Sequence, residues 1–240
     1  MENGFNFLII FLSVVIFILL FWMIYSKWFS GENVINSSQL NLNTTNPLPN
    51  ITAITLSQPT STRYAYGLWV YVSNWNTNTK VLFSRNSDVI LYLDKTSGSL
   101  NCVLKPSGYT DPTVDPSTLT ATPTANIQFP ITNNFPLQKW VYIILNFDNT
   151  ILDVYLDGKM IKSITVPRVS PDGESVINYG YNWDAVIANF KRWSYPLDPQ
   201  SAWNAYMAGN GTGFARLAGQ YHGSFTITKG TNPYSDFKLF

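Results

Sequence analysis

Acidic side chains are considered first, because two of them at the right spacing can cleave a glycosidic bond. The chain has only three glutamates, Glu2, Glu32 and Glu174, and no two of them are close in sequence. Asp153 and Asp157 are four residues apart and could share a strand face, but Asp157 belongs to an Asp-Gly pair typical of a hairpin turn. The acidic residues therefore predict no glycosidase site.

The single histidine and the single cysteine restrict the chemistry further. His222 lies in Gln-Tyr-His-Gly without a nucleophile elbow, so no Ser-His-Asp triad is predicted, and one histidine cannot form a two-histidine metal site. Cys102 has no partner for a disulfide or a CxxC site, and it shares a face with Leu100 and Leu104, which predicts a packed thiol. We expect no catalytic residue and predict that the protein is not an enzyme.

Aromatic residues among Asn and Gly are the remaining candidates for binding. Rings in such surroundings can stack on a sugar or on a protein neighbour. The same rings can instead anchor loops or fill a core, and the sequence leaves both roles open. The candidate ligand- or partner-binding residues are Trp75, Tyr179, Tyr181 and Trp183.

The composition narrows the class of partner. Charged residues make up 12% of the chain, against about 25% in an average soluble domain. Lys and Arg number 15 and Asp and Glu 14, for a net charge of +1. Such a surface cannot neutralise many phosphates, so we expect no nucleic-acid partner. Polarity supplied by Asn, Thr, Ser and Tyr suits contact with proteins or sugars.

The N-terminal region contains the longest apolar run. Residues 7–25 carry no charge and one polar residue, Ser13, and a helix of this length matches the roughly 30 Å of a bilayer core. The run is longer than the apolar part of a secretory signal, and no cleavage site of small residues follows. We expect residues 1–29 to be a single-pass anchor in a lipid bilayer, of unspecified orientation. The residues expected at the membrane interface are Trp22, Tyr25, Lys27 and Trp28.

Residues 30–62 change to Asn, Ser, Thr, Leu and Pro, which predicts a polar linker before a domain over residues 63–240. An extended linker of this length would reach on the order of 100 Å, so the domain need not touch the bilayer. N-glycosylation sequons occur in the linker and near the end of the chain, and they matter only if this side enters a secretory lumen. They lie at Asn36, Asn43, Asn50 and Asn210.

From residue 63 onward the pattern is typical of β structure. The proline-rich stretch 105–136 is expected to be a surface excursion outside the sheets. Residues 140–166 predict a three-strand meander with a type I′ turn at Asp157–Gly158. A short helix is expected between Asp198 and Gly209. Strands are predicted over 64–72, 81–83, 89–93, 100–104, 140–147, 152–156, 159–166 and 185–193.

The order of these elements resembles the concanavalin A-like lectin/glucanase superfamily, and within it the laminin-G-like and pentraxin-like jelly-roll domains. Three segments carry the resemblance: YGLWVYV, FPLQKWVYIILNFDNTILDVYLDGKMIKS and IANFKRWSYPLDPQSAWNAY. The resemblance covers residues 64–209 and implies an all-β jelly-roll sandwich, here preceded by one transmembrane helix and a polar linker. Positions that match the family pattern are Trp140, Tyr155, Asp157, Gly158 and Leu197.

The resemblance also bears on activity and metals. Glucanases of the superfamily carry an E-x-D-x-E or E-x-D-x-x-E strand, which is absent from this chain. Many of the binding domains hold Ca²⁺ through Asp and Asn in rim loops, and no other cofactor is implied. No ligand spacing links the loop residues available here, and Asp and Asn are also common turn formers. The Ca²⁺ candidates are Asp148, Asn149 and Asp184, with Asp111 and Asp115 as further loop aspartates.

Three hypotheses of function follow. The first is a non-catalytic, membrane-anchored structural protein whose lectin-like sandwich docks on protein neighbours. Its architecture is similar to that of proteins of large icosahedral DNA viruses with an internal membrane, and this resemblance implies the role of a minor capsid protein that could join the membrane to the capsid shell in the virion. The alternative is a membrane-anchored carbohydrate-binding module. The third is a degenerate glycoside hydrolase.

Overall fold

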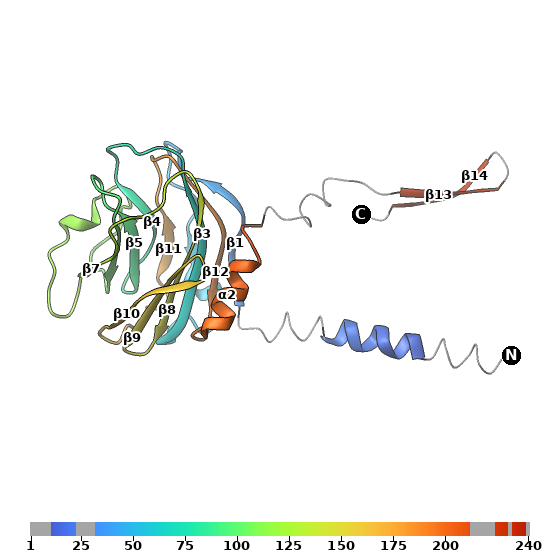
Figure 1. Ribbon diagram of the computed structural model, residues 1–240, viewed down its shortest axis with the longest axis horizontal. Coiled ribbons are helices and arrows are strands. Elements are labelled where there is room, and N and C mark those ends of the chain that lie inside the picture. Colours follow the sequence, from blue (N-terminus) through green and yellow to red (C-terminus); the bar gives the residue numbers. More distant parts are fainter. Residues whose placement is uncertain (1–10, 23–31, 212–223, 230–231, 239–240) are drawn as a thin grey trace.

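A computed structural model describes residues 11–22, 32–211, 224–229 and 232–238. Two six-stranded antiparallel sheets face each other and enclose the main core, so the predicted all-β sandwich is confirmed (Figure 1). The first sheet runs β1 (Glu32–Asn41), β12 (Ala185–Trp193), β3 (Arg63–Val72), β8 (Trp140–Asp148), β9 (Ile151–Leu156), β10 (Lys159–Thr165). The second runs β2 (Ile51–Thr52), β11 (Val176–Tyr179), β4 (Lys80–Arg85), β5 (Val89–Leu93), β6 (Leu100–Leu104), β7 (Ile127–Thr132). A separate hairpin pairs β13 (Ser224–Lys229) with β14 (Asn232–Lys238).

Strand β3 shows why the sheet is covered on both faces. Tyr64 and Tyr66 point into the core between the sheets, where they contact Phe147 and Phe83. Trp69 belongs to a second apolar cluster on the outer face of the same sheet. Aromatic and β-branched residues on both faces of a strand are therefore buried by two different layers.

The predicted meander is confirmed over β8, β9 and β10. Asp157 and Gly158 both have positive φ, as the type I′ turn requires, and the Asp157 carboxylate accepts a hydrogen bond from the Tyr142 amide. Gly158 is also needed for packing, because a Cβ there would lie 2.7 Å from the ring of Trp203.

Helix α2 (Pro199–Met207) covers the outer face of the first sheet (Figure 1). The Asp198 carboxylate caps its N-terminus by accepting from the Ser201 amide, and Gly209 follows its C-terminus with positive φ, as predicted. Leu197 is buried beneath it. The cluster under α2 contains Trp69, Tyr142, Tyr155, Trp193 and Leu197, with Trp140 and Tyr206 packed against it.

Residues 32–62, expected to be a linker, are part of the sandwich. Strand β1 pairs with β12 from Glu32 opposite Trp193 to Asn41 opposite Val186. Leu42 and Ala53 are fully buried in the core. The prediction failed because an edge strand with one face exposed to solvent can be built from Asn, Ser and Gln, a composition also typical of linkers.

The expected surface excursion over residues 105–136 is shorter than predicted. Its last part forms the edge strand β7, in which Pro130 is tolerated because an edge strand leaves half of its backbone groups unpaired. The remaining loop packs on the outer face of the second sheet through Tyr109 and Leu119.

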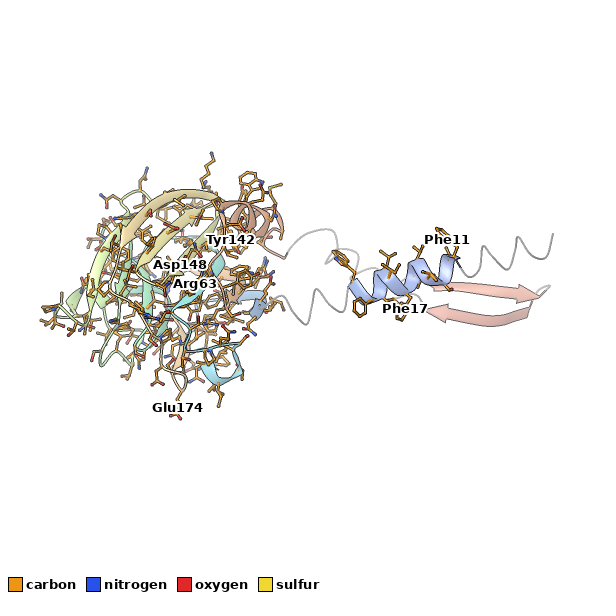
Figure 2. All side chains as sticks on the ribbon, turned by 90° about the horizontal axis from the view of Figure 1, so that it is seen from below. Phe11, Phe17, Arg63, Tyr142, Asp148 and Glu174 are labelled. Carbon is orange, nitrogen blue, oxygen red and sulfur yellow. The ribbon has the colours of Figure 1, made fainter. Side chains whose placement is uncertain are left out.

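A helix over residues 11–22 lies within the predicted anchor. Its apolar side chains are exposed around the helix, with Phe17 at 70%, and Phe11 and Phe17 project from it (Figure 2). Within the described part of the chain, no helix has both the length and the apolar character to cross a bilayer. Of the predicted interface residues, Trp22 is exposed, and Tyr25, Lys27 and Trp28 lie outside the described residues.

Candidate binding site

Loops at one end of the sandwich form two neighbouring hollows that share Tyr181. We call the residues that line them the Tyr181 rim. One hollow of about 180 Å³ is lined by Thr77, Asn78, Thr79, Lys95, Thr113, Tyr181 and Asn182. The other, of about 260 Å³, is lined by Pro47, Leu48, Thr110, Asp111, Pro112, Asn178, Tyr179 and Tyr181.

The segment that carries Tyr181 is fixed by close backbone contacts. Gly180 lies so near β4 that a Cβ on it would be 1.8 Å from the Val81 carbonyl oxygen. The indole N–H of Trp183 donates to that same oxygen at 3.0 Å. The Asn78 side chain donates to the Asn182 carbonyl at 2.6 Å, and this bond joins the loop before β4 to the segment that carries Tyr181. The backbone on both sides of Tyr181 is therefore attached to the sandwich.

Lys80 organises the loops on the other side of the smaller hollow. The side chain is fully buried, and its ammonium donates to the carbonyl oxygens of Asn76 at 2.5 Å, Asn78 at 3.1 Å and Lys95 at 3.0 Å. It also lies 4.4 Å from the centre of the Trp75 ring. Burial lowers the pKa of Lys80, with Asp94 opposing the shift. Three carbonyls around one cation resemble a metal site in which the lysine supplies the charge.

The structure gives different roles to the four aromatic residues that the sequence proposed for binding. Tyr181 is partly exposed and lines both hollows. Trp183 is only 1% exposed, so it is a core residue and not a surface for stacking. Trp75 is half-buried under Lys80. Tyr179 is buried against Phe190, and its hydroxyl has no hydrogen-bond partner among the described residues. Burial raises its pKa.

The Ca²⁺ candidates do not come together. Asp148 and Asn149 lie where β8 meets the start of β3, and Asp148 pairs with Arg63 at 2.9 Å. Asp184 lies at the other end of β3, beside Ser73, and accepts from Asn74. Asp111 and Asp115 accept from their own turns. Over the residues that the structure describes, no three His, Cys, Asp or Glu side chains form a metal-binding group.

The acidic residues considered for catalysis are separated in space as well. Glu32 pairs with Lys191 at 2.7 Å, Glu174 projects from the surface (Figure 2), and Asp153 accepts from Ser163 at 2.6 Å on an edge hairpin. Glu2 and His222 lie outside the described residues. Cys102 is buried in the core, as predicted, and burial raises its pKa.

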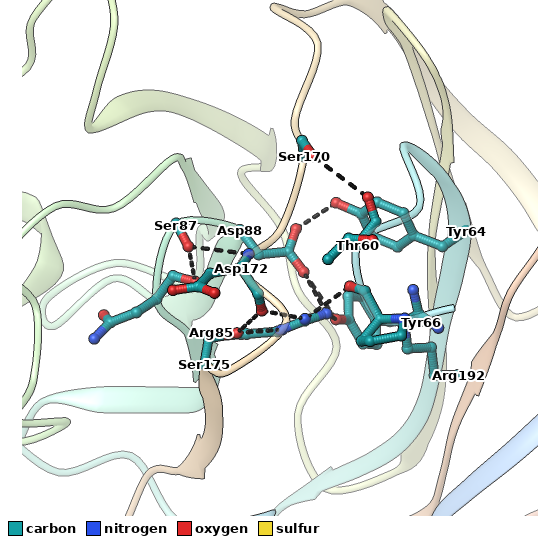
Figure 3. A network of polar contacts seen from close by, with 12 residues as sticks. Thr60, Tyr64, Tyr66, Arg85, Ser87, Asp88, Ser170, Asp172, Ser175 and Arg192 are labelled. Carbon is teal, nitrogen blue, oxygen red and sulfur yellow. Dashed lines mark hydrogen bonds and ion pairs between the residues drawn. The ribbon is translucent and has the colours of Figure 1, made fainter. Parts of the chain in front are cut away.

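A cluster that the sequence did not reveal lies between the sheets (Figure 3). Asp88 accepts from the hydroxyls of Tyr64 and Tyr66 and lies 3.6 Å from the guanidinium of Arg85. Burial raises the pKa of Asp88, and Arg85 opposes that shift. Because the side chains of Arg85 and Asp88 are wholly closed to solvent, no substrate reaches them, and the cluster joins the two sheets.

Arg192 extends the same interior cluster toward the chain that precedes β3. Its guanidinium lies over the rings of Tyr64 and Tyr66 and donates to the carbonyls of Ser57 and Gln58. Arg85 donates in the same way to Pro59. Two buried arginines therefore fix residues 57–59 onto the sandwich.

The predicted glycosylation residues differ in accessibility. Asn43 and Asn50 are exposed in the segment between β1 and β2. Asn36 lies within β1, where its side chain accepts from the amide of Ser38. Asn210 follows α2 and is partly exposed.

Sequence reasoning missed the rim residues Asn78, Lys95 and Asn182, and also Lys80, which holds the rim loops together without lining a hollow. Lys80 carried a signal, since it is the only charged residue between Arg63 and Arg85. The other three are ordinary loop residues, and only the folded chain brings them beside Tyr181.

Comparison with known proteins gives a family for the chain. A family model described as concanavalin A-like lectin/glucanases superfamily matches residues 44–202, about two thirds of the sequence. The match begins inside the segment that we expected to be a linker. No curated protein sequence matches the chain.

The chain is similar to solved structures of low sequence identity. The binding domain of botulinum neurotoxin DC, solved in complex with rat synaptotagmin II, aligns with a TM-score of 0.50 and 14% identity over 73% of this chain. This chain spans 45% of that protein. Domain 4 of AbnA, an extracellular arabinanase from Geobacillus stearothermophilus solved with arabinotriose, aligns with a TM-score of 0.44 and 14% identity, over 73% of this chain and 87% of that one.

The family match and the two-sheet architecture agree with each other and with the sequence motifs at Trp140, Tyr155, Asp157, Gly158 and Leu197. The chain therefore belongs to the concanavalin A-like lectin/glucanases superfamily.

Proposed function

We propose that this protein is a non-catalytic tether, held at a membrane by its N-terminal apolar segment, whose Tyr181 rim binds a protein neighbour. One observation carries the proposal. The chain enters the sandwich at Glu32, opposite Trp193 at the end of β12, whereas Tyr181 precedes the start of the same strand. Nine strand residues, roughly 30 Å, separate the attachment from the rim, so a partner can reach the rim while the protein stays anchored.

The anchor is supported by its composition. Residues 7–25 contain no charged residue, and the described helix over 11–22 exposes Phe, Leu, Ile and Val side chains around its circumference. An apolar helix of this kind needs an apolar environment on every side, which a bilayer supplies. We further propose, from the resemblance of this architecture to that of minor capsid proteins of large icosahedral DNA viruses, that the tether joins an internal membrane to the capsid shell of a virion.

The absence of catalysis is proposed from the acidic residues. Retaining and inverting glycosidases need two carboxyl groups about 5–10 Å apart across the scissile bond. Among the described carboxylates, Asp88 is enclosed, and Glu32 and Asp148 are each paired with a cation. Hydrolysis of any glycan by the full chain, abolished by Asp153→Asn, would overturn this part of the proposal.

Photo-cross-linking tests the tether. A photoreactive amino acid at Tyr181, in full-length protein within its native membranes or particles, should form a discrete adduct with one neighbouring protein. The matched control carries the same group at Ile151, which is 46% exposed at the start of β9, beside the Arg63 end of β3 and away from the rim. A tether that uses the rim requires an adduct from position 181 that position 151 does not give. Equal or absent adducts from both positions would exclude it.

A second candidate function, glycan binding, is favoured by the chemistry of the two hollows. Asn, Thr and Tyr residues line both hollows and supply groups that can form hydrogen bonds with sugar hydroxyls. Tyr181 shared by both hollows suits stacking on a pyranose face. This function requires saturable binding of the full chain on a glycan array that is lost on Tyr181→Ala, because Trp183 is part of the core. A protein adduct from position 181 without glycan binding favours the tether.

A further inference from the structure

The distance between the predicted membrane span and the sandwich is short. The apolar run ends at Tyr25 and β1 begins at Glu32, so six residues join them. Even fully extended, that connection reaches about 25 Å. The 33-residue linker expected from composition would have allowed a far larger separation, but residues 32–62 are folded into the sandwich. If the anchor of the proposed function holds, the end of the sandwich at Glu32 is confined to the membrane surface.

The surface beside that attachment is α2 and the strands it covers. Glu32 lines a hollow of about 280 Å³ together with Trp193, Tyr195 and residues of α2. The carboxylate of Glu32 accepts from the indole N–H of Trp193 and pairs with Lys191. Because Glu32 and residues of α2 line the same hollow, the helix lies beside the point at which the chain enters the sandwich.

Large apolar and aromatic side chains are exposed on this face among uncharged polar residues of β1 and α2. Val34 on β1 is exposed, as are Tyr195 between β12 and α2, and Trp203 and Met207 on α2. Met207 is 64% exposed and Trp203 40%. The helix PQSAWNAYM contains no charged residue, and the Asp198 carboxylate at its N-cap accepts from the Ser201 amide and hydroxyl. The nearby charges of Glu32 and Lys191 neutralise each other.

We infer that this face, formed by β1, the end of β12 and α2, lies against the lipid headgroups of the membrane that holds the anchor. Trp and Tyr side chains favour the boundary between headgroups and acyl chains, where their polar edge can stay in contact with water, and Met207 adds apolar surface to be buried. The short connection keeps the face at high local concentration near the bilayer, so weak contacts are sufficient. The inference rests on the proposed anchor.

A single-cysteine label tests the contact in the full chain. The one native cysteine, Cys102, is buried, so a cysteine placed on the surface can be labelled alone. Met207→Cys and, as the matched control, Val114→Cys would carry an environment-sensitive fluorophore. Val114 is 45% exposed on the loop over the opposite sheet. Each protein is reconstituted into phosphatidylcholine vesicles with or without bromine on the acyl chains.

Flotation of the vesicles is measured first. If the protein does not float at alkaline pH, the chain is not anchored in the bilayer, and both the proposed anchor and this inference are wrong. For protein that floats, the label at 207 should lose about half of its emission in brominated vesicles, because an interfacial helix sits roughly 5–10 Å into the headgroup boundary. The label at 114 should be unchanged. Equal emission at both sites overturns the inference while leaving the anchor intact.

One further outcome also counts against lipid contact. If the emission at 207 shifts to shorter wavelength without quenching by bromine, and does so in proportion to the density of protein in the vesicle, a second copy covers the face. Unchanged melting temperatures of both labelled proteins show that neither substitution disturbed the sandwich.

Discussion

Lys80 brings a full positive charge into the loops that form the Tyr181 rim. Carbonyl oxygens of Asn76, Asn78 and Lys95 surround its ammonium, and the Trp75 ring covers one side. Asn76 and Asn78 lie in the loop before β4, and Lys95 lies in the loop after β5. Without the ammonium of Lys80, the carbonyl oxygens of these two loops would face one another with no donor between them. A buried charge in this position is stabilised by the hydrogen bonds and in turn fixes the shape of the smaller hollow.

Replacing Lys80 should therefore damage both stability and the rim. Lys80→Met keeps the length of the side chain but leaves three carbonyls without a donor, which should lower the free energy of unfolding by about 2–4 kcal/mol. Urea unfolding of the full chain in nonionic detergent measures this loss. Lys95→Met changes an exposed lysine of the same rim and should cost less than about 0.5 kcal/mol. Equal losses in the two variants would contradict the organising role of Lys80.

At the scale of elements, the first sheet includes strand β1, whose sequence of mostly polar residues gives little indication of β structure. Strand β1 covers the edge of β12, and the segment after it contributes Leu42 and Ala53 to the core. The carbonyls of Ser57 and Gln58 accept from the buried Arg192. This segment is as necessary to the sandwich as the central strands.

A fragment that begins at residue 63 should not fold cooperatively. It would lose the apolar contacts of residues 42–56, the Ser57 and Gln58 carbonyls that accept from Arg192, and the Pro59 carbonyl that accepts from Arg85. We expect a cost comparable to the whole stability of about 5–15 kcal/mol of a typical domain. A fragment over residues 32–240 retains all of these contacts. Circular dichroism during heating should show a cooperative transition for the longer fragment only. Similar melting of both fragments would mean that residues 32–62 are dispensable.

The cap of α2 gives a prediction about pH. Hydrogen bonds from the Ser201 amide and hydroxyl lower the pKa of Asp198 below its ordinary value of 3.8. A lowered folded-state pKa contributes stability above the unfolded-state pKa, and that contribution is lost as the pH falls through the folded-state value. The melting temperatures of the wild type and Asp198→Asn should therefore converge as the pH falls below 3.8. A constant difference down to pH 2 would show that the carboxylate charge does not contribute.

These elements also show what could be predicted from the sequence. The meander, the Asp157–Gly158 turn and the cap of α2 depend on local chemistry, so spacing was sufficient to place them. Strand β1 depends on pairing with β12, more than 140 residues away, and a polar edge strand has no strong local pattern. Trp183 was misjudged for a related reason. Its neighbours Asn182 and Asp184 are polar, but only the sandwich shows that the indole is turned inward to Val81.

At the scale of the whole molecule, the low charge bears on how the sandwich could bind a membrane, which is either by attraction of basic residues to anionic lipid or by burial of apolar side chains. Basic surfaces bind anionic lipids with about 1 kcal/mol for each Lys or Arg near the headgroups. This protein has a net charge of +1, and α2 has no charged residue. The proposed contact between α2 and the bilayer therefore depends on burial of apolar side chains together with the short connection to the anchor, and not on attraction to anionic lipid.

It follows that vesicle charge and salt should matter little. Quenching of the label at position 207 should change by less than about twofold when anionic lipid replaces part of the phosphatidylcholine, or when salt rises from roughly 50 to 500 mM. This rise shortens the screening length from about 14 to about 4 Å, but α2 carries no charged residue whose attraction to lipid could be screened. An appended basic segment at the C-terminus serves as the positive control and should make binding salt-dependent. A steep loss of quenching in the unmodified chain at high salt would mean that basic residues, and not Trp203 and Met207, hold the sandwich at the membrane.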